Sequence, residues 1–219
     1  VEGHDACRKI CILSSLVFGK HVYPEWVHCE GISSITAEDA QYAESWGGAV
    51  KLIGSVKRTA DGKILPIVRP AFVCGANQLS SVNDVFNGIM VYGDAIDQVM
   101  FYGRGAGKFP TASAIVADLI DAAKMKGTSI SQVWEDSKDN SFIADYKEDV
   151  LPFYVRVQGV SKDKAKEVFS EVEFLTRESC PADEIAFITP EIKEKDFDEK
   201  LTQLGGKVLG KIRVLNLES

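Results

Sequence analysis

The stretch AVKLIGSVKRTADGKILPIVRPAFV (residues 49–73) contains two apolar runs separated by an Asp-Gly pair. An Asp-Gly pair between such runs is typical of a β-hairpin, because its residues accept the backbone angles of a tight turn. We therefore predict two antiparallel strands here. A second strand pair is predicted in DVFNGIMVYGD (84–94) and AIDQVMFYG (95–103), around Gly93 and Asp94. Residues 49–102 are expected to form a sheet with helices on one face.

Three segments in the first 127 residues have the pattern of helices. Residues 5–18 are apolar on nearly every side and stop at Gly19, which predicts a helix buried on all sides. Thr36, with Asp39 three residues later, resembles a capping box at the start of a second helix that ends near Trp46. The segment PTASAIVADLIDAAKMKG (110–127) begins with proline, has apolar residues at helical spacing and ends in glycine, so we predict a third helix.

The remainder of the chain is organised differently. Residues 127–150 are polar and weakly patterned, and we interpret them as a linker or surface segment. Residues 151–219 follow the order strand, helix, strand, strand, helix, strand, with Ser161 capping the first helix, as in a ferredoxin-like domain. The predicted fold class is α+β. A mixed β-sheet covered by helices on one face occupies residues 1–126, a linker follows at 127–150, and a small ferredoxin-like βαββαβ domain occupies 151–219.

The composition argues against several classes of protein. The chain has 219 residues, of which 45% are hydrophobic and 26% charged, as in a globular protein. Its net charge of −7 argues against general nucleic-acid binding, which needs a basic face. No apolar run approaches the ~18 residues that span a bilayer, and there is no secretory signal, so we expect a cytoplasmic protein without membrane contact. The five cysteines fit no disulfide or zinc spacing, which predicts reduced thiols and no metal site.

The first predicted helix carries an acid and an amine one turn apart, Asp5 and Lys9. One interpretation is an ordinary (i, i+4) ion pair that supports the start of the helix. The other starts from the expected burial of this helix, since charges at the end of a buried helix usually face a cleft. Burial and the neighbouring Arg8 would lower the pKa of the amine towards neutrality, so that it could donate or accept a proton at neutral pH. The acid would then hold the ammonium group of an amino-acid substrate.

A glycine-rich loop, YGRGAGKFPT (102–111), lies between a predicted strand and a predicted helix. Its spacing is G-x-G-x-G, whereas a dinucleotide-binding fold has G-x-G-x-x-G. Two interpretations remain open. The glycines either turn a tight corner, or they let backbone N–H groups at the helix start face a cofactor or substrate anion. In the second case the residues that bind are Gly103, Gly105, Ala106 and Gly107.

Three segments together resemble the homoserine dehydrogenases. VEGHDACRKICILSSLVFG (1–19) is similar to the signature of that family at Val1, Gly3, Asp5, Arg8 and Lys9. EGISSITAEDAQYAESWGGAVKLIG (30–54) and YGRGAGKFPTASAIVADLIDAA (102–123) look like two further blocks of it. The resemblance therefore covers roughly residues 1–126, the catalytic, substrate-binding and dimerisation region.

The resemblance implies NAD- or NADP-dependent reduction of L-aspartate 4-semialdehyde to L-homoserine, a step in threonine, methionine and isoleucine biosynthesis. It implies that Lys9 is the proton donor or acceptor, that Asp5 binds and orients the substrate, and that the glycine loop closes over the nucleotide. Two copies are expected to pair through the sheet of residues 49–102 as a symmetric homodimer, and related enzymes bind a monovalent cation, which the full-length enzyme would share. The family's N-terminal nucleotide-binding domain is absent from these 219 residues, so we expect the chain alone to be inactive.

The last region, residues 152–216, looks similar to an ACT domain, a regulatory module that senses threonine in many homoserine dehydrogenases. Its first loop reads QGVSKDKAKEV, and only Gly159 matches the family's usual ligand-binding turn. An effector site and a degenerate domain used for assembly both remain open. A second hypothesis for the chain as a whole is a regulatory or oligomerisation module without chemistry that retains the scaffold.

Overall fold

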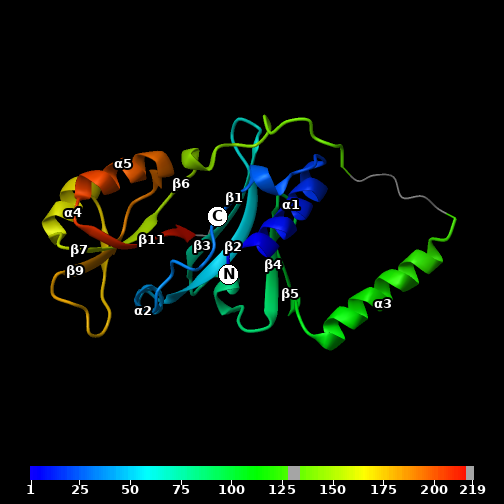
Figure 1. Cartoon of the computed structure of the whole chain (residues 1–219), viewed down its shortest axis with the longest axis horizontal. Helices are drawn as coiled ribbons and strands as arrows, with labels where there is room; N and C mark the ends of the chain where they lie inside the picture. The colour runs from blue at the N-terminus through cyan, green and yellow to red at the C-terminus, as the bar shows by residue number, and fades with distance from the viewer. Residues whose placement is uncertain (128–133, 216–219) are drawn as a thin grey trace. The chain divides into compact units, whose positions relative to one another are not determined.

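The computed structural model of the chain describes residues 1–127 and 134–215, which have the predicted α+β fold (Figure 1). They fall into two compact units, one within Val1–Ala76 and Val133–Ser219 and the other within Asn77–Gln132. Among the helices that the structure describes, none has the length and hydropathy needed to cross a membrane. The predicted boundaries at 126/127 and 150/151 remain a prediction, and one hydrogen-bonded sheet runs across the second of them.

Strand β3 (Ile64–Cys74) is paired along both edges in the seven-stranded sheet of the first unit. Strand β2 (Gly48–Arg58) pairs with it antiparallel along its whole length, which confirms the predicted hairpin. The turn between them closes at Thr59 and Lys63, with Gly62 at a φ of 82°. The other edge of β3 pairs in parallel with two short stretches, β1 (His28–Cys29) and the end of β11 (Lys207–Leu215).

The predicted succession of strands and helices after residue 151 is present in the structure. It consists of β7 (Phe153–Gln158), α4 (Lys162–Phe169), β8 (Glu173–Leu175), β9 (Glu184–Ile188), α5 (Glu194–Leu204) and β11. In space the strands follow the order β11-β7-β9-β8 and are antiparallel throughout. Because β11 also pairs with β3, these strands extend the sheet of the first 74 residues instead of forming a separate one.

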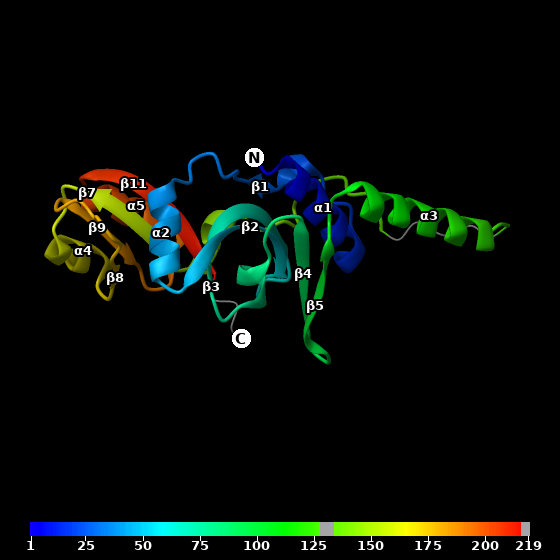
Figure 2. The ribbon, with the colours of Figure 1, turned by 90° about the horizontal axis from the view of Figure 1, so that it is seen from below.

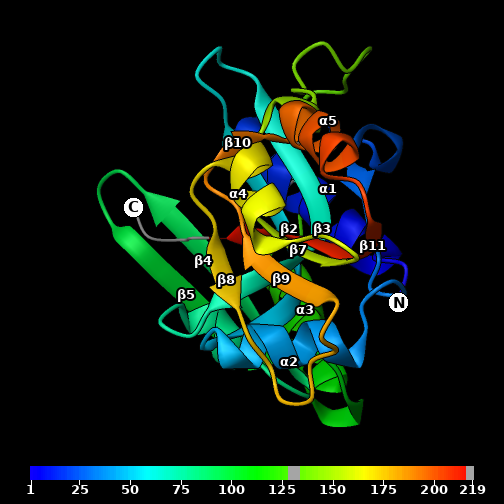
Figure 3. The same cartoon turned by 90° about the vertical axis from the view of Figure 1, so that its left-hand side faces the viewer.

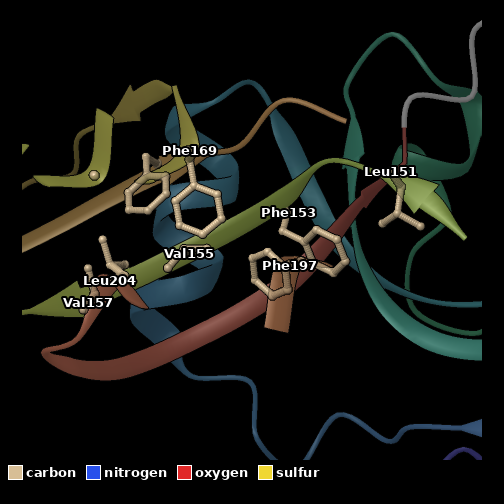
Figure 4. Packing of buried hydrophobic residues seen from close by; sticks show 9 residues of the cluster. Leu151, Phe153, Val155, Val157, Phe169, Phe197 and Leu204 are labelled. Atoms are coloured by element: carbon tan, nitrogen blue, oxygen red, sulfur yellow. The ribbon is translucent and has the colours of Figure 1, made fainter. Parts of the chain in front are cut away.

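Helices cover both faces of this extended sheet (Figures 1 and 3). Helices α1 (His4–Phe18) and α2 (Ala37–Ser45) contact the even-numbered residues of β3: α1 packs on Val68, and α2 packs on Phe72. Helices α4 and α5 pack on the opposite face of β7 and β9 (Figure 4). Successive strand residues point to opposite faces, so Tyr154 contacts the α2 side and Val155 the α4–α5 side.

Short elements join these layers. They are η1 (Pro24–Trp26), η3 (Tyr146–Glu148), and the antiparallel pair of β6 (Val150–Leu151) with β10 (Ile192–Lys193). The described part of the predicted linker, residues 134–150, is tied to the sheet. Ile64 donates its N–H to the carbonyl of Phe142, and Ala144 donates to the carbonyl of Ile64.

The prediction that the first helix is buried on all sides is wrong. Cys7, Ile10 and Cys11 are buried against the sheet. On the other side of α1 the exposed apolar side chains are Ile12 (54%), Leu16 (44%) and Val17 (69%). The reason is that α1 lies on one face of the sheet, and within the described residues nothing covers its outer side. The predicted stop is confirmed, because Gly19 adopts the left-handed conformation.

The second unit contains η2 (Gln78–Ser81), β4 (Phe86–Gly93), β5 (Asp97–Arg104) and α3 (Lys108–Lys124). Strands β4 and β5 pair antiparallel as predicted (Figure 2). The expectation that residues 49–102 form one sheet is wrong, since these two strands make a two-stranded sheet of their own. Both edges of β3 are already occupied, by β2 on one side and by β1 and β11 on the other.

The start of α2 is joined to the C-terminal strands by one buried carboxylate. The predicted capping box is confirmed: Asp39 donates its N–H to the Thr36 hydroxyl and accepts the Thr36 N–H. Asp39 is 1% exposed and also accepts hydrogen bonds from the Tyr154 hydroxyl (3.0 Å) and Arg156 Nε (2.9 Å). A bulge in β11 brings Gly210 next to this carboxylate.

Replacing Gly210 with alanine tests this close approach. The added Cβ would lie 2.5 Å from Asp39 Oδ1, so the carboxylate or the strand must move. We expect Gly210→Ala to lower the free energy of unfolding by about 1–3 kcal/mol, seen as a lower thermal midpoint. The matched control is Gly54→Ala in β2, whose Cβ would make ordinary contact with Ile10 Cβ at 3.5 Å. Equal thermal midpoints for the two variants would contradict the close approach of Gly210 to the Asp39 carboxylate.

Candidate functional site

Asp5 and Lys9 form the predicted ion pair near the start of α1. Lys9 Nζ lies 2.7 Å from Asp5 Oδ2 across one helical turn. The Lys9 side chain is 60% exposed and the Asp5 side chain 84% exposed. The (i, i+4) geometry is therefore confirmed, whereas the premise that burial of α1 places both charges in an enclosed cleft is wrong for the described residues.

The ion pair keeps the acid charged. The hydrogen bond and the positive charge of Lys9 lower the pKa of Asp5 below its ordinary value, and Arg8 adds a smaller effect in the same direction. A carboxylate only accepts hydrogen bonds, and an ammonium group only donates them. The pair thus presents an acceptor and a donor side by side, which suits a substrate that carries both an ammonium group and a carbonyl oxygen.

The backbone before α1 rests on the segment that follows β1. Gly3, the N-cap of α1, has a φ of 81°, and a Cβ there would lie 3.2 Å from the Glu30 carbonyl oxygen. A Cβ on Gly31 would lie 2.5 Å from the carbonyl oxygen of Val1. Ile32 donates its N–H to that same carbonyl at 2.9 Å. Only glycine permits this approach, so the two segments hold the start of α1 in place.

Glu30 is in turn bound by an arginine from the last strand. Arg213 of β11 makes two hydrogen bonds to the Glu30 carboxylate, both 2.8 Å, and donates from Nε to Glu194 Oε2 at 2.8 Å. Burial alone would raise the pKa of Glu30, but hydrogen bonds from His28 and Arg213 lower it to about 2. Burial alone would lower the pKa of Arg213, and its hydrogen bonds to Glu30 and Glu194 raise it instead. No motif or spacing in the sequence marks Glu30 or Arg213 as functional.

A hollow of about 720 Å³ lies in the same unit beside β1. Its walls include Trp26, His28, Leu65 and Tyr146, and the His28 ring stacks on the Tyr146 ring at 3.6 Å. Neither Asp5 nor Lys9 lines this hollow. The hollow is therefore distinct from the surface that presents the ion pair.

The glycine loop belongs to the second unit and joins β5 to α3. Gly105 donates its N–H to the Val85 carbonyl, and a Cβ on Gly105 would overlap the Asn87 side chain. Gly107 is the N-cap of α3 with a φ of 123°, while a Cβ on Gly103 would meet nothing within 4 Å. The exposed loop combines a corner that needs glycine with N–H groups at the start of a 17-residue helix, a setting that favours anions.

The cysteines and acidic side chains supply no metal centre in the part of the chain that the structure describes. Within residues 1–127 and 134–215, no group of three or more His, Cys, Asp or Glu side chains is placed to hold a metal ion. All five cysteines are free thiols in the structure. Burial and the neighbouring Cys7 raise the pKa of Cys11 to about 12, so this thiol stays protonated at neutral pH.

The known proteins that this chain resembles are homoserine dehydrogenases. The family model described as "Homoserine dehydrogenase" matches residues 1–120. The homoserine dehydrogenase of Bacillus subtilis is 36% identical over 219 residues, covering 93% of this chain and 50% of that protein. The enzyme of the same name from Synechocystis is 48% identical over 124 residues, covering 55% of this chain and 29% of that protein.

Solved structures extend this similarity to the whole chain. A homoserine dehydrogenase from Thiobacillus denitrificans superposes with a TM-score of 0.83 at 27% identity, over 100% of this chain and 54% of that one. The enzyme from S. aureus gives a TM-score of 0.76 at 29% identity, over 100% of this chain and 55% of that one. The chain thus spans about half the length of these proteins, or less.

The ion pair makes a prediction about titration. Because Lys9 is the main cause of the lowered Asp5 pKa, Lys9→Met should raise that pKa toward the ordinary value for an aspartate. The measurement is a ¹³C NMR titration of the Asp5 side-chain carboxyl. Lys164→Met, which removes the exposed Lys164–Glu167 pair of α4, should leave Asp5 unchanged. The same Asp5 titration midpoint with and without Lys9 would show that the pair does not persist in solution.

Proposed function

The chain belongs to the homoserine dehydrogenase family, and we propose that it supplies the substrate-binding and dimerisation region of an enzyme that reduces L-aspartate 4-semialdehyde to L-homoserine with NADH or NADPH. The observation that carries this proposal is the family match over residues 1–120, which include both Asp5–Lys9 and the glycine loop.

The pair has the chemistry that aldehyde reduction requires. As hydride reaches the aldehyde carbon, negative charge gathers on the oxygen, and the Lys9 ammonium stabilises that charge and donates the proton that completes the alcohol. Asp5 holds Lys9 at 2.7 Å and accepts a hydrogen bond from the substrate ammonium group. A bound nicotinamide supplies the hydride. The reverse reaction uses the same groups, with Lys9 accepting the proton.

The glycine loop fits the phosphate part of such a cofactor. It is exposed, it lies at the start of α3, and the space beside Gly103 is open, so backbone N–H groups can approach an anion. We assign Gly103, Ala106 and Gly107 to this role, while Gly105, whose N–H is donated to the Val85 carbonyl, forms the corner that shapes the loop. The preference between NAD and NADP, and any monovalent cation, would be determined by parts of the enzyme outside these residues.

The exposure of Asp5 and Lys9 indicates what else the enzyme needs. A reacting aldehyde must be shielded from water, and the relatives are about twice as long as this chain. We infer that a segment outside the 219 residues covers the pair and holds most of the nucleotide. The 219-residue chain alone would then show no dehydrogenase turnover.

We also propose that the enzyme is a cytoplasmic homodimer. One face of the β4–β5 hairpin exposes the large apolar side chains of Ile89, Val91 and Phe101, which a second copy would cover. The βαββαβ unit is proposed to serve assembly, since it shares its sheet with the first region. Saturable heat on titrating threonine into the full-length enzyme would instead assign it an effector site.

A non-catalytic regulatory or oligomerisation module is the second candidate. One observation favours it: the ion pair lies on the surface of the described chain, where it also serves as an ordinary helix-stabilising pair. A spectrophotometric assay of the full-length protein with L-homoserine and NADP or NAD separates the two candidates. Turnover supports the dehydrogenase, and its absence with a folded, nucleotide-binding protein supports the module.

Removing the Lys9 amine tests the catalytic assignment. We expect Lys9→Ala in the full-length enzyme to lower kcat by roughly 10²–10⁴-fold, because the proton donor is lost, with nucleotide KM nearly unchanged. The matched control is Lys164→Ala, which removes an exposed lysine whose Nζ is 3.1 Å from Glu167 on α4. A kcat for Lys9→Ala equal to that of the control would refute the role of Lys9.

Replacing Gly103 with alanine tests the loop. The added methyl group meets nothing within 4 Å, so the loop itself is not disturbed. If the loop lies against the cofactor, Gly103→Ala should raise the KM for the nucleotide about tenfold by obstructing that approach, a loss of roughly 1.4 kcal/mol. The Gly54→Ala variant is the control. Unchanged nucleotide KM would remove Gly103 from the binding surface.

A further inference from the structure

The backbone ahead of Asp5 and Lys9 is connected to the last strand of the fold through Glu30. Three close contacts carry the connection from Glu30 to the helix: the Glu30 carbonyl against Gly3, Gly31 against the Val1 carbonyl, and the Ile32 N–H on that same carbonyl. Glu30 also donates its N–H to the Val68 carbonyl of β3 at 2.8 Å. A shift of the Glu30 backbone would therefore disturb the contacts that hold the start of α1.

Arg213 fixes the side chain of Glu30. A guanidinium group that makes two parallel hydrogen bonds to one carboxylate sets its direction as well as its distance. Arg213 is itself held from the other side by both oxygens of Glu194, at the start of α5. Its side chain is only 7% exposed, so water does not compete freely for these bonds.

We propose that Arg213 is a positioning residue for the Asp5–Lys9 pair, acting through Glu30, so that the C-terminal βαββαβ unit sets the geometry of the reaction site. The proposal rests on the proposed function of that pair. Lys9 must reach a substrate oxygen from a helix whose first turn has a fixed place, and a displacement of about 1 Å at such a site can cost up to ~10²-fold in rate. The Arg213–Glu30 ion pair supplies that constraint from outside the catalytic region.

The kinetic test uses the full-length enzyme with Glu30→Gln, Arg213→Met and Arg213→Lys. We expect the first two to lower kcat about tenfold or more with nucleotide KM nearly unchanged, because the pair is displaced while the cofactor site is untouched. Arg213→Lys keeps the charge and should recover part of the loss. Glu30→Gln preserves the shape of a partly exposed side chain and is the variant least disruptive to folding.

The matched control is Glu184→Gln. Glu184 is a buried acid that binds Arg156 and Arg177, as Glu30 binds Arg213, but it lies beside α2 and does not contact the segment before α1. It should lower the thermal midpoint and leave kcat near the wild-type value. If folded Glu30→Gln and Arg213→Met retain wild-type kcat, or if Glu184→Gln lowers kcat equally, the positioning role is refuted.

A second measurement does not depend on activity. Amide hydrogen exchange in the first turns of α1, where Cys7 donates to the Gly3 carbonyl, should become at least about fivefold faster in Glu30→Gln and Arg213→Met. Exchange in α4 should not change, and Glu184→Gln should leave α1 unaffected. Unchanged exchange in α1 would overturn the proposal. If exchange in α1 is faster in the variants but the wild-type enzyme shows no turnover, the contact of Glu30 with α1 is supported and the dehydrogenase function is rejected.

Discussion

The complete pairing and burial of strand β3 determine the arrangement of the first unit. Every residue from Ile64 to Val73 is buried, one edge is paired with β2, and the other is shared by β1 and β11. No further strand can pair with β3, because both of its edges are occupied. Its even-numbered residues form the surface on which α1 and α2 pack. The strand contains one buried charged side chain, Arg69. Burial lowers the pKa of Arg69 to about 10, although the nearby carboxylate of Asp149 acts in the opposite direction.

The features that local pattern determines were predicted from the sequence. The Asp-Gly turn, the Thr36–Asp39 capping box, the stop at Gly19 and the order of elements after residue 151 each depend on residues close together in the chain, and all are present. The pairings between distant segments could not be predicted. Nothing in the alternation of β4 and β5 shows that they pair only with each other, and nothing in β11 shows that it runs parallel to β3.

The candidate site likewise has features that the local sequence predicts and features that depend on distant parts of the chain. The spacing of Asp5 and Lys9 predicts their ion pair because four residues make one helical turn. Their exposure could not be predicted, since an all-apolar helix pattern does not show which of its faces the rest of the chain covers. The contact of Glu30 with Arg213 joins two residues that are far apart in sequence and individually ordinary for their segments, so only the folded arrangement shows it.

The parallel pairing of β3 with β11 has a consequence for biosynthesis. During translation the ribosome releases β3 long before β11. Until β11 emerges, residues 71–73 of β3 lack their partner strand, and α2 lacks the strands that bind Asp39. Such long-range pairing raises contact order, which slows folding and prolongs the exposure of apolar surface. The nascent polypeptide therefore completes this sheet only after β11 (Lys207–Leu215) has emerged, and chaperones have most to protect in that interval.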